Sequence, residues 1–191
     1  QHASFLYLAQ ADILTRMQNK KAAIRLLEEA SKNLPDDPEL VYAQVLLLDP
    51  HQDRNKLDEL LANLLKIEPN SPTYLNAYAY TLAMQNRRLE EARRYVEQAL
   101  EYAPEQASIL DTYGYICYLQ NDFATAADVL YKAYQLNPSV KIGVRYARSL
   151  YMNGDIQHFH QVLQQLQQNH PNDPELKQLN SLLLAPQNQT S

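Results

Sequence analysis

The chain has 191 residues, of which 46% are hydrophobic, so it can form a sizeable core and is not compositionally disordered. Its formal net charge is -5, and its acidic and basic residues are interspersed, which argues against a basic surface for nucleic acid or anionic membranes. No apolar run reaches the roughly 18 residues that cross a bilayer, and the single cysteine, Cys117, excludes an intrachain disulfide. Only three glycines are present, which indicates a nearly all-helical protein with short turns.

A helical pattern begins almost at once, over residues 5 to 17. The numbering opens at Gln1 without an initiator Met. We therefore expect this sequence to be a piece of a longer or processed chain.

Three columns of residues then recur along the chain with one period. Prolines that end helical segments are spaced by 34, 35, 34 and 33 residues, at Pro35, Pro69, Pro104, Pro138 and Pro171. A second column contains Ala11, Val45, Ala79, Gly114 and Ala147. A third column contains Ala23, Leu57, Ala92, Ala126 and Phe159.

Each period has helical apolar spacing that a polar turn interrupts once, which predicts a helix, a turn and a second helix. Such a pair cannot bury its apolar stripe alone and must stack on its neighbours. We therefore expect one domain, a single α-solenoid over residues 1–185. The expected repeats are 4–37, 38–71, 72–106, 107–140 and 140–173. A capping helix over 173–185 and a disordered tail over 186–191 follow.

The residues of this period resemble the tetratricopeptide repeat (TPR). Residues 107–140 match the family positions best, residues 72–106 match nearly as well with one extra residue in the turn, and residues 38–71 depart most. The resemblance implies an all-α fold: a right-handed α-solenoid of about five helix pairs plus a C-terminal capping helix.

Catalytic and metal-binding patterns are weak. Cys117 has no His at helical contact spacing, so it is interpreted as a small buried residue. His158 and His160 point about 200° apart on a helix, which is poor geometry for one metal. The phosphate-binding glycine loops and the nucleophile-elbow motif are missing. We expect no enzyme activity, no catalytic residue, no metal and no cofactor.

One helix, within residues 108–122, shows how the faces divide. With about 100° per residue, Tyr115 and Tyr118 share a face, and Tyr113 points away from it. The repeat register assigns Tyr113 to the large core position and Gly114 to a close approach between helices. By the family resemblance, Tyr115 and Tyr118 face a concave groove where partners bind.

The same register places a row of tyrosines and polar residues in that groove. Rigid rings with a few orienting polar groups are typical of protein-binding surfaces. Matching positions in the third and fourth repeats supply no cation, which disfavours a clamp for a terminal carboxylate. Packing of the tyrosines along adjacent first helices is the alternative interpretation. The predicted groove residues are Asn76, Tyr80, Asp111, Tyr115, Tyr118, Arg145, Arg148 and Tyr151.

We therefore expect a non-enzymatic scaffold or adaptor that binds a partner protein or peptide, with no nucleic acid and no transmembrane segment. Residues 70 to 173 also resemble Gram-negative outer-membrane TPR lipoproteins, some of which are adaptors of carboxyl-terminal processing proteases. That resemblance implies such a protease as partner and the periplasmic side of the outer membrane as location, with a cytoplasmic location as the alternative. A self-associating structural subunit, such as a homodimer, is the second hypothesis.

Overall fold

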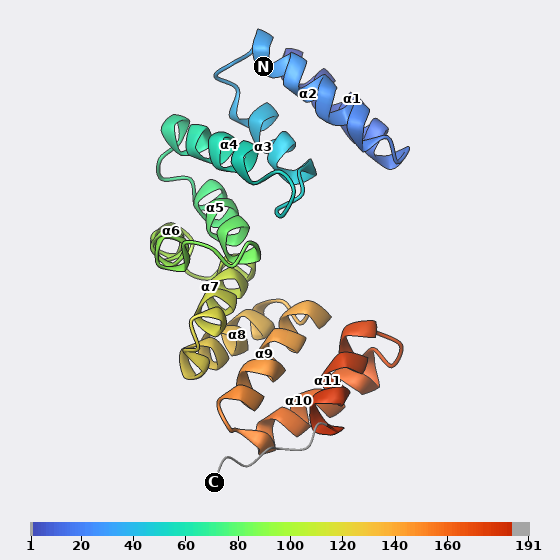
Figure 1. Cartoon of the computed structure of the whole chain (residues 1–191), viewed down its shortest axis with the longest axis vertical. Helices are drawn as coiled ribbons and strands as arrows, with labels where there is room; N and C mark the ends of the chain where they lie inside the picture. Colours follow the sequence, from blue (N-terminus) through green and yellow to red (C-terminus); the bar gives the residue numbers. More distant parts are fainter. Residues whose placement is uncertain (1, 185–191) are drawn as a thin grey trace. The chain divides into compact units, whose positions relative to one another are not determined.

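A computed structural model describes residues 2–184 of the chain, and within them it contains eleven α-helices and no strand. The helices form two compact units, the first ending at Arg88 and the second beginning at Leu89. Figure 1 gives the order of the helices along the chain. The predicted all-α repeat fold is confirmed. The prediction that one solenoid runs without a break through both units stays a prediction.

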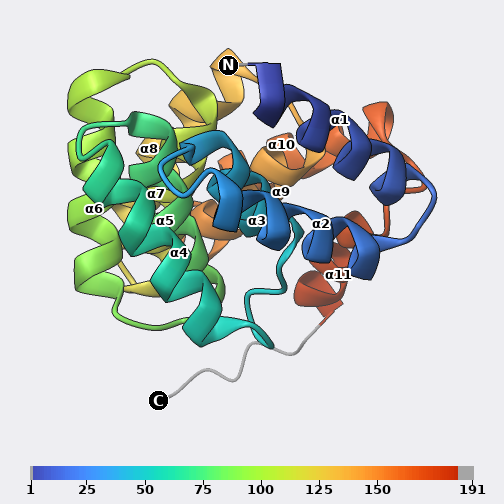
Figure 2. The same ribbon diagram turned by 90° about the horizontal axis from the view of Figure 1, so that it is seen from above.

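The first unit contains five helices, in which each helix packs on the next along the chain. Figures 1 and 2 show α1 and α2 side by side in both views. A buried apolar cluster joins these two helices to α3 through Ala11, Ala23, Leu27, Ala30 and Leu40. The helices are α1 (His2–Arg16), α2 (Lys20–Asn33), α3 (Pro38–Leu47), α4 (Arg54–Ile67) and α5 (Pro72–Met84).

The second unit contains six helices, and its core is continuous from α7 to the end of the described chain. Leu130 of α8, Phe159 of α10 and Leu179 of α11 all belong to that core. The helices are α6 (Leu89–Tyr102), α7 (Ala107–Leu119), α8 (Phe123–Leu136), α9 (Val140–Met152), α10 (Ile156–Asn169) and α11 (Pro174–Leu184).

The capping helix that the sequence predicts corresponds to α11. Its first turn is capped by Asp173, whose Oδ1 accepts a hydrogen bond from the Glu175 amide at 2.8 Å. Pro174 occupies the first helical position, where its missing N–H costs nothing. Leu176 and Leu179 are buried against α9 and α10. Residue 185 and the predicted tail 186–191 lie outside the described residues.

Four of the turns inside the helix pairs use the same backbone device. A residue in the left-handed region ends the first helix, and the amide that follows it donates to the carbonyl five residues back, as in Asp122 N to Cys117 O at 2.9 Å. These residues lie at equivalent repeat positions, seven after the small-residue column. They are Gln18, Asn86, Asn121 and Gly154.

The other turn, between α3 and α4, departs from that pattern, as the sequence predicts for residues 38–71. The first helix of this pair has only 10 residues and ends at Leu47. Leu48 is extended, and Pro50 follows two residues later. Asp49 Oδ1 then accepts hydrogen bonds from the amides of His51 and Gln52, so a side chain organises the turn in place of a left-handed residue.

Candidate functional site

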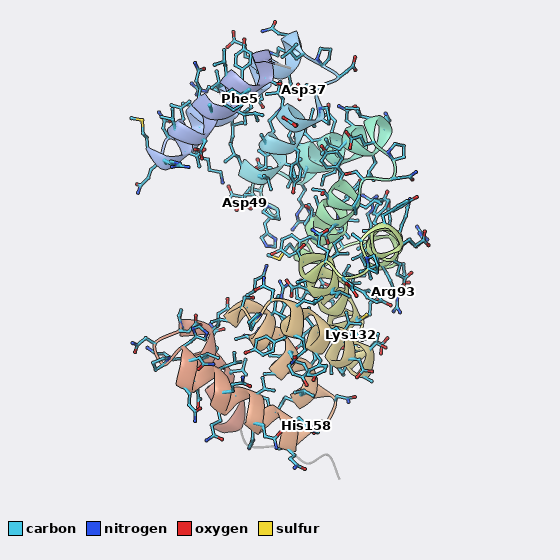
Figure 3. All side chains as sticks on the ribbon, turned by 180° about the vertical axis from the view of Figure 1, so that it is seen from behind. Phe5, Asp37, Asp49, Arg93, Lys132 and His158 are labelled. Carbon is cyan, nitrogen blue, oxygen red and sulfur yellow. The ribbon has the colours of Figure 1, made fainter. Side chains whose placement is uncertain are left out.

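The face of α7 that carries Tyr113 belongs to the fold. Its ring packs against the core, and its hydroxyl accepts a hydrogen bond from Arg93 of α6 at 3.2 Å and donates to Glu97 at 3.3 Å. Burial raises the pKa of the Tyr113 hydroxyl. The sequence predicts a core position for Tyr113, but its side chain is only partly buried. It bridges α6 and α7 instead. Figure 3 marks Arg93 on α6.

Gly114 marks a close approach of α7 and α8, as predicted. A Cβ atom at this position would lie 2.4 Å from Leu130 Cγ and 2.9 Å from Leu130 Cδ2. These separations are far below van der Waals contact, and Leu130 is fully buried. The missing side chain therefore lets the two helices pack.

Another face of α7 meets α9 at four side chains, which we call the α7–α9 cluster: Asp111, Tyr115, Lys141 and Arg145. Arg145 Nη1 donates to Asp111 Oδ2 at 2.6 Å, and the guanidinium carbon lies 4.2 Å from the centre of the Tyr115 ring. Lys141 Nζ is 3.8 Å from the same carboxylate oxygen. Each helix contributes two residues spaced four apart, so the two pairs meet on facing helix surfaces.

The ion pair in this cluster is removed from water. The side chains of Asp111 and Arg145 are 8% and 14% exposed. Asp111 Oδ1 is also buried, and it accepts no hydrogen bond within the described part of the chain. Removing one partner of such a pair leaves the other buried and charged, which costs about 3–5 kcal/mol. Arg145 is therefore held in one position, with Tyr115 beneath it.

Tyr118 and Tyr151 pack against other aromatic rings and are also partly exposed. The Tyr118 ring meets Phe123 edge to face with centroids 5.5 Å apart, and the Tyr151 ring lies 5.2 Å from Phe159. Both tyrosines are partly buried against the core of the second unit. The packing interpretation therefore holds for part of each ring.

The remaining predicted residues lie away from the cluster or in the other unit. Arg148 is half-buried on α9, and its Nη2 is 3.5 Å from Gln178 Oε1 on α11. Asn76 and Tyr80 lie on α5 of the first unit, both partly buried. The structure thus brings together Asp111, Tyr115 and Arg145 among the eight predicted residues.

Sequence reasoning missed Lys141 and Gln178. Lys141 lies one helical turn before Arg145, so the four-residue spacing could have found it. Nothing local indicates Gln178, because its contact with Arg148 depends on how α11 folds back.

The residues considered for catalysis have ordinary structural surroundings. Cys117 is buried, and burial raises the pKa of its thiol to about 11, opposite to what a nucleophile needs. His158 Nδ1 contacts Asp155 Oδ2 at 2.7 Å at the start of α10. In the described part of the chain, no three His, Cys, Asp or Glu side chains gather as a metal site would require. None of the described helices has the length and apolar character that crossing a membrane requires.

Family models of one repeat type match most of the second unit and the end of the first. Two family models, both described as tetratricopeptide repeat, match residues 79–140 and 118–183. A curated relative, "TPR repeat-containing protein PA4667" of Pseudomonas aeruginosa, is 31% identical over 141 residues. That alignment includes 74% of this chain but 24% of the relative, so the chain spans about a quarter of the relative's length.

Solved structures have the same fold. TTC0263, a thermophilic TPR protein of Thermus thermophilus, aligns with a TM-score of 0.75 and 22% identity over 93% of this chain and 97% of its own. YrrB, described as a TPR protein with an unusual peptide-binding site, aligns with a TM-score of 0.67 and 10% identity. That alignment covers 92% of this chain and 90% of YrrB. At these identities the likeness concerns the fold alone.

Proposed function

Because the chain belongs to the tetratricopeptide-repeat family, we propose that it is a non-enzymatic scaffold. It binds another protein, or a peptide segment of one, along the first helix of successive helix pairs. Family and fold are both typical of binding scaffolds. The proposed contact residues are Asn76, Tyr80, Asp111, Tyr115, Tyr118, Arg145, Arg148 and Tyr151.

The observation that carries this proposal is the fixed position of Arg145 between the Asp111 carboxylate and the Tyr115 ring. A side chain that is already ordered loses little rotamer entropy when a partner binds, and a tyrosine ring offers a large contact area with few rotatable bonds. Lys141 and Arg148 add partly exposed positive charge on the same helix. The second unit therefore offers an ordered aromatic contact beside hydrogen-bond donors.

A peptide ligand is consistent with this chemistry. YrrB, which shares the fold, is described as having an unusual peptide-binding site. Guanidinium and ammonium groups donate to backbone carbonyls or carboxylates of an extended segment, and Tyr115 packs against its side chains. We propose an extended segment rather than a terminal carboxylate as the ligand of the first-helix face.

Our finer proposal is that the partner is a periplasmic carboxyl-terminal processing protease, for which this chain is an adaptor on the outer membrane. It rests on the resemblance of residues 70 to 173 to outer-membrane TPR lipoproteins. Affinity capture from the source organism, followed by mass spectrometry, tests it. Recovery of other proteins without any such protease would remove the adaptor proposal and leave the scaffold proposal in place.

The groove residues are tested by the double variant Tyr80→Ala with Tyr115→Ala. We expect helical content to be unchanged and the captured amount of the partner to fall by about tenfold or more, since hot-spot aromatic rings each contribute about 2 kcal/mol or more. The matched control is Tyr102→Ala with Tyr131→Ala, two exposed tyrosines on the second helices α6 and α8. Equal capture by the wild-type chain and the groove variant would show that the tyrosines serve packing alone.

Self-association is the competing function, in which the predicted groove residues and the irregular second repeat, whose α3–α4 turn departs from the others, bind a second copy of the chain. Light scattering across a range of protein concentrations separates the two. A monomer at all concentrations is expected for the scaffold. A stable dimer that the Tyr80 and Tyr115 double variant dissociates would replace the scaffold by an assembly subunit.

A further inference from the structure

A row of large apolar side chains on the first helix is exposed to solvent. Leu6 and Ile13 are 62% and 56% exposed, Phe5 is exposed on the same helix, and Met17 is exposed in the turn just after α1 ends at Arg16. With about 100° per residue, Phe5, Leu6 and Ile13 fall within about 100° of the helix circumference. Met17 extends this row just past the end of the helix, where its amide still donates to the Ile13 carbonyl at 2.9 Å. We call these four residues the α1 stripe. Figure 3 marks Phe5 on α1.

Exposure of this stripe is specific to the first helix pair. The repeat register gives Leu6 and Ile13 an equivalent in each later pair. The equivalents of Leu6 are at most 8% exposed: Leu40, Tyr74, Ile109 and Ile142. The equivalents of Ile13 are Leu47, which is partly buried, and the buried Thr81, Ile116 and Ser149. The same repeat positions are therefore covered in every pair but the first.

In the pairs that begin with α3 and α9, the second helix of the preceding pair packs on this face. Leu40 of α3 shares a buried cluster with Leu27 and Ala30 of α2. Ile142 of α9 shares the second unit's core with Leu130 and Ala133 of α8. Leu27 and Leu130 are equivalent in the repeat, as are Ala30 and Ala133, so both contacts use an apolar residue and an alanine three positions apart.

We propose that the α1 stripe is a docking surface for a further helix pair of this same repeat type, from outside residues 1–191. The second helix of that pair covers Leu6 and Ile13 with an apolar residue and an alanine three positions apart, as α2 covers Leu40. This surface is separate from the proposed partner-binding residues, and the inference does not depend on the proposed function. A stripe of this kind is what a repeat array leaves where another repeat stacks.

A fusion tests the proposal directly. Residues 107–139 are duplicated and joined to Ser4, which is the repeat equivalent of Val140, so the added α8 sequence meets α1 in register. We expect amide exchange in α1 to slow by about tenfold or more relative to the unfused chain. Leu6→Glu with Ile13→Glu in the fusion should restore the faster exchange, because buried carboxylates are strongly disfavoured.

The matched control is Gln164→Glu with Gln168→Glu, which adds the same two charges at exposed positions of α10. It should leave the slow exchange of the fusion unchanged. A second fusion, in which residues 4–37 are duplicated ahead of Ser4, replaces the first if that one does not fold. Folded fusions without slower exchange in α1 would overturn the proposal.

Sedimentation equilibrium of the unfused chain tests the rival occupant, a second copy of the chain. We expect a monomer across the measured concentrations. A dimer that Leu6→Glu with Ile13→Glu dissociates, while the Gln164 and Gln168 control stays dimeric, would assign the stripe to self-association and overturn the proposal.

Discussion

The helix over Ala107–Leu119 divides its residues between packing and recognition one by one. Gly114 removes a side chain where Leu130 approaches, and Tyr113 joins α7 to α6 through Arg93 and Glu97. Tyr115 lies under the Arg145 guanidinium. Neighbouring residues thus have different tasks because each step turns the helix by about 100°.

At this scale we predict that Gly114→Ala destabilises the protein by about 1–3 kcal/mol through overpacking against Leu130. Alanine is better than glycine inside a helix by about 1 kcal/mol, so a loss means that the clash exceeds this gain. Urea denaturation followed by circular dichroism measures the change.

The control is the same substitution in a Leu130→Ala background, where the clashing atoms are gone. There Gly114→Ala should be neutral or stabilising, and the two substitutions should be non-additive. An equal loss in both backgrounds would mean that the close approach to Leu130 is not the cause.

At the scale of the element, the second helix of each pair packs on the first helix of the next pair, and α11 packs on α9 and α10 in the second unit. Leu176 and Leu179 complete the core around Phe159 and Leu166. The apolar faces of α9 and α10 are therefore covered by α11, in contrast with the α1 stripe.

For this helix we predict that Leu176→Ala or Leu179→Ala lowers the free energy of unfolding of α10 by about 2–5 kcal/mol, as large-to-small substitutions do at buried sites. Amide exchange in α10 under native conditions measures it. Lys177→Ala, at an exposed position between the two leucines, should change it by less than about 0.5 kcal/mol. No change for either leucine would show that α11 does not stabilise α10.

Most of the helix pairs could be predicted, because the 34-residue period repeats apolar positions and turns together. The capping helix could be predicted from Asp173 and Pro174 at its start. The contact of Arg148 with Gln178 could not be predicted, since it depends on tertiary folding rather than helical spacing. For the same reason, the packing of Tyr118 against Phe123 could not be predicted, and the sequence predicts only that Tyr118 faces a groove.

At the scale of the whole molecule, the two compact units meet in the chain between Arg88 and Leu89, inside the third predicted repeat. The repeat period runs through this boundary, and it predicts one array in which neighbouring repeats stabilise each other. Spacing alone cannot reveal a division of this kind, because the residue types on each side of the turn still fit the repeat.

We predict that Leu27→Ala, a cavity in the first unit, speeds amide exchange in α5 and also in α6, if the array is continuous as its period predicts. Hydrogen exchange with mass spectrometry resolves the two helices. The reciprocal variant Leu130→Ala should affect α5 as well as α8. Effects that stop at residue 88 in both variants would contradict continuity.

The turn at this boundary has one residue more than the turns that contain Gln18, Asn121 and Gly154, and its residues Asn86 and Arg88 have positive φ angles of 47° and 51°. The extra residue does not change which face of α6 is buried, since Ala92, Val96 and Ala99 are buried like their equivalents in the other pairs. Chain length can therefore change here without altering the register on either side. We expect a short insertion at this turn, such as an epitope or a cleavage sequence, to leave the buried faces of both neighbouring helices in place, which makes the turn a site for engineering.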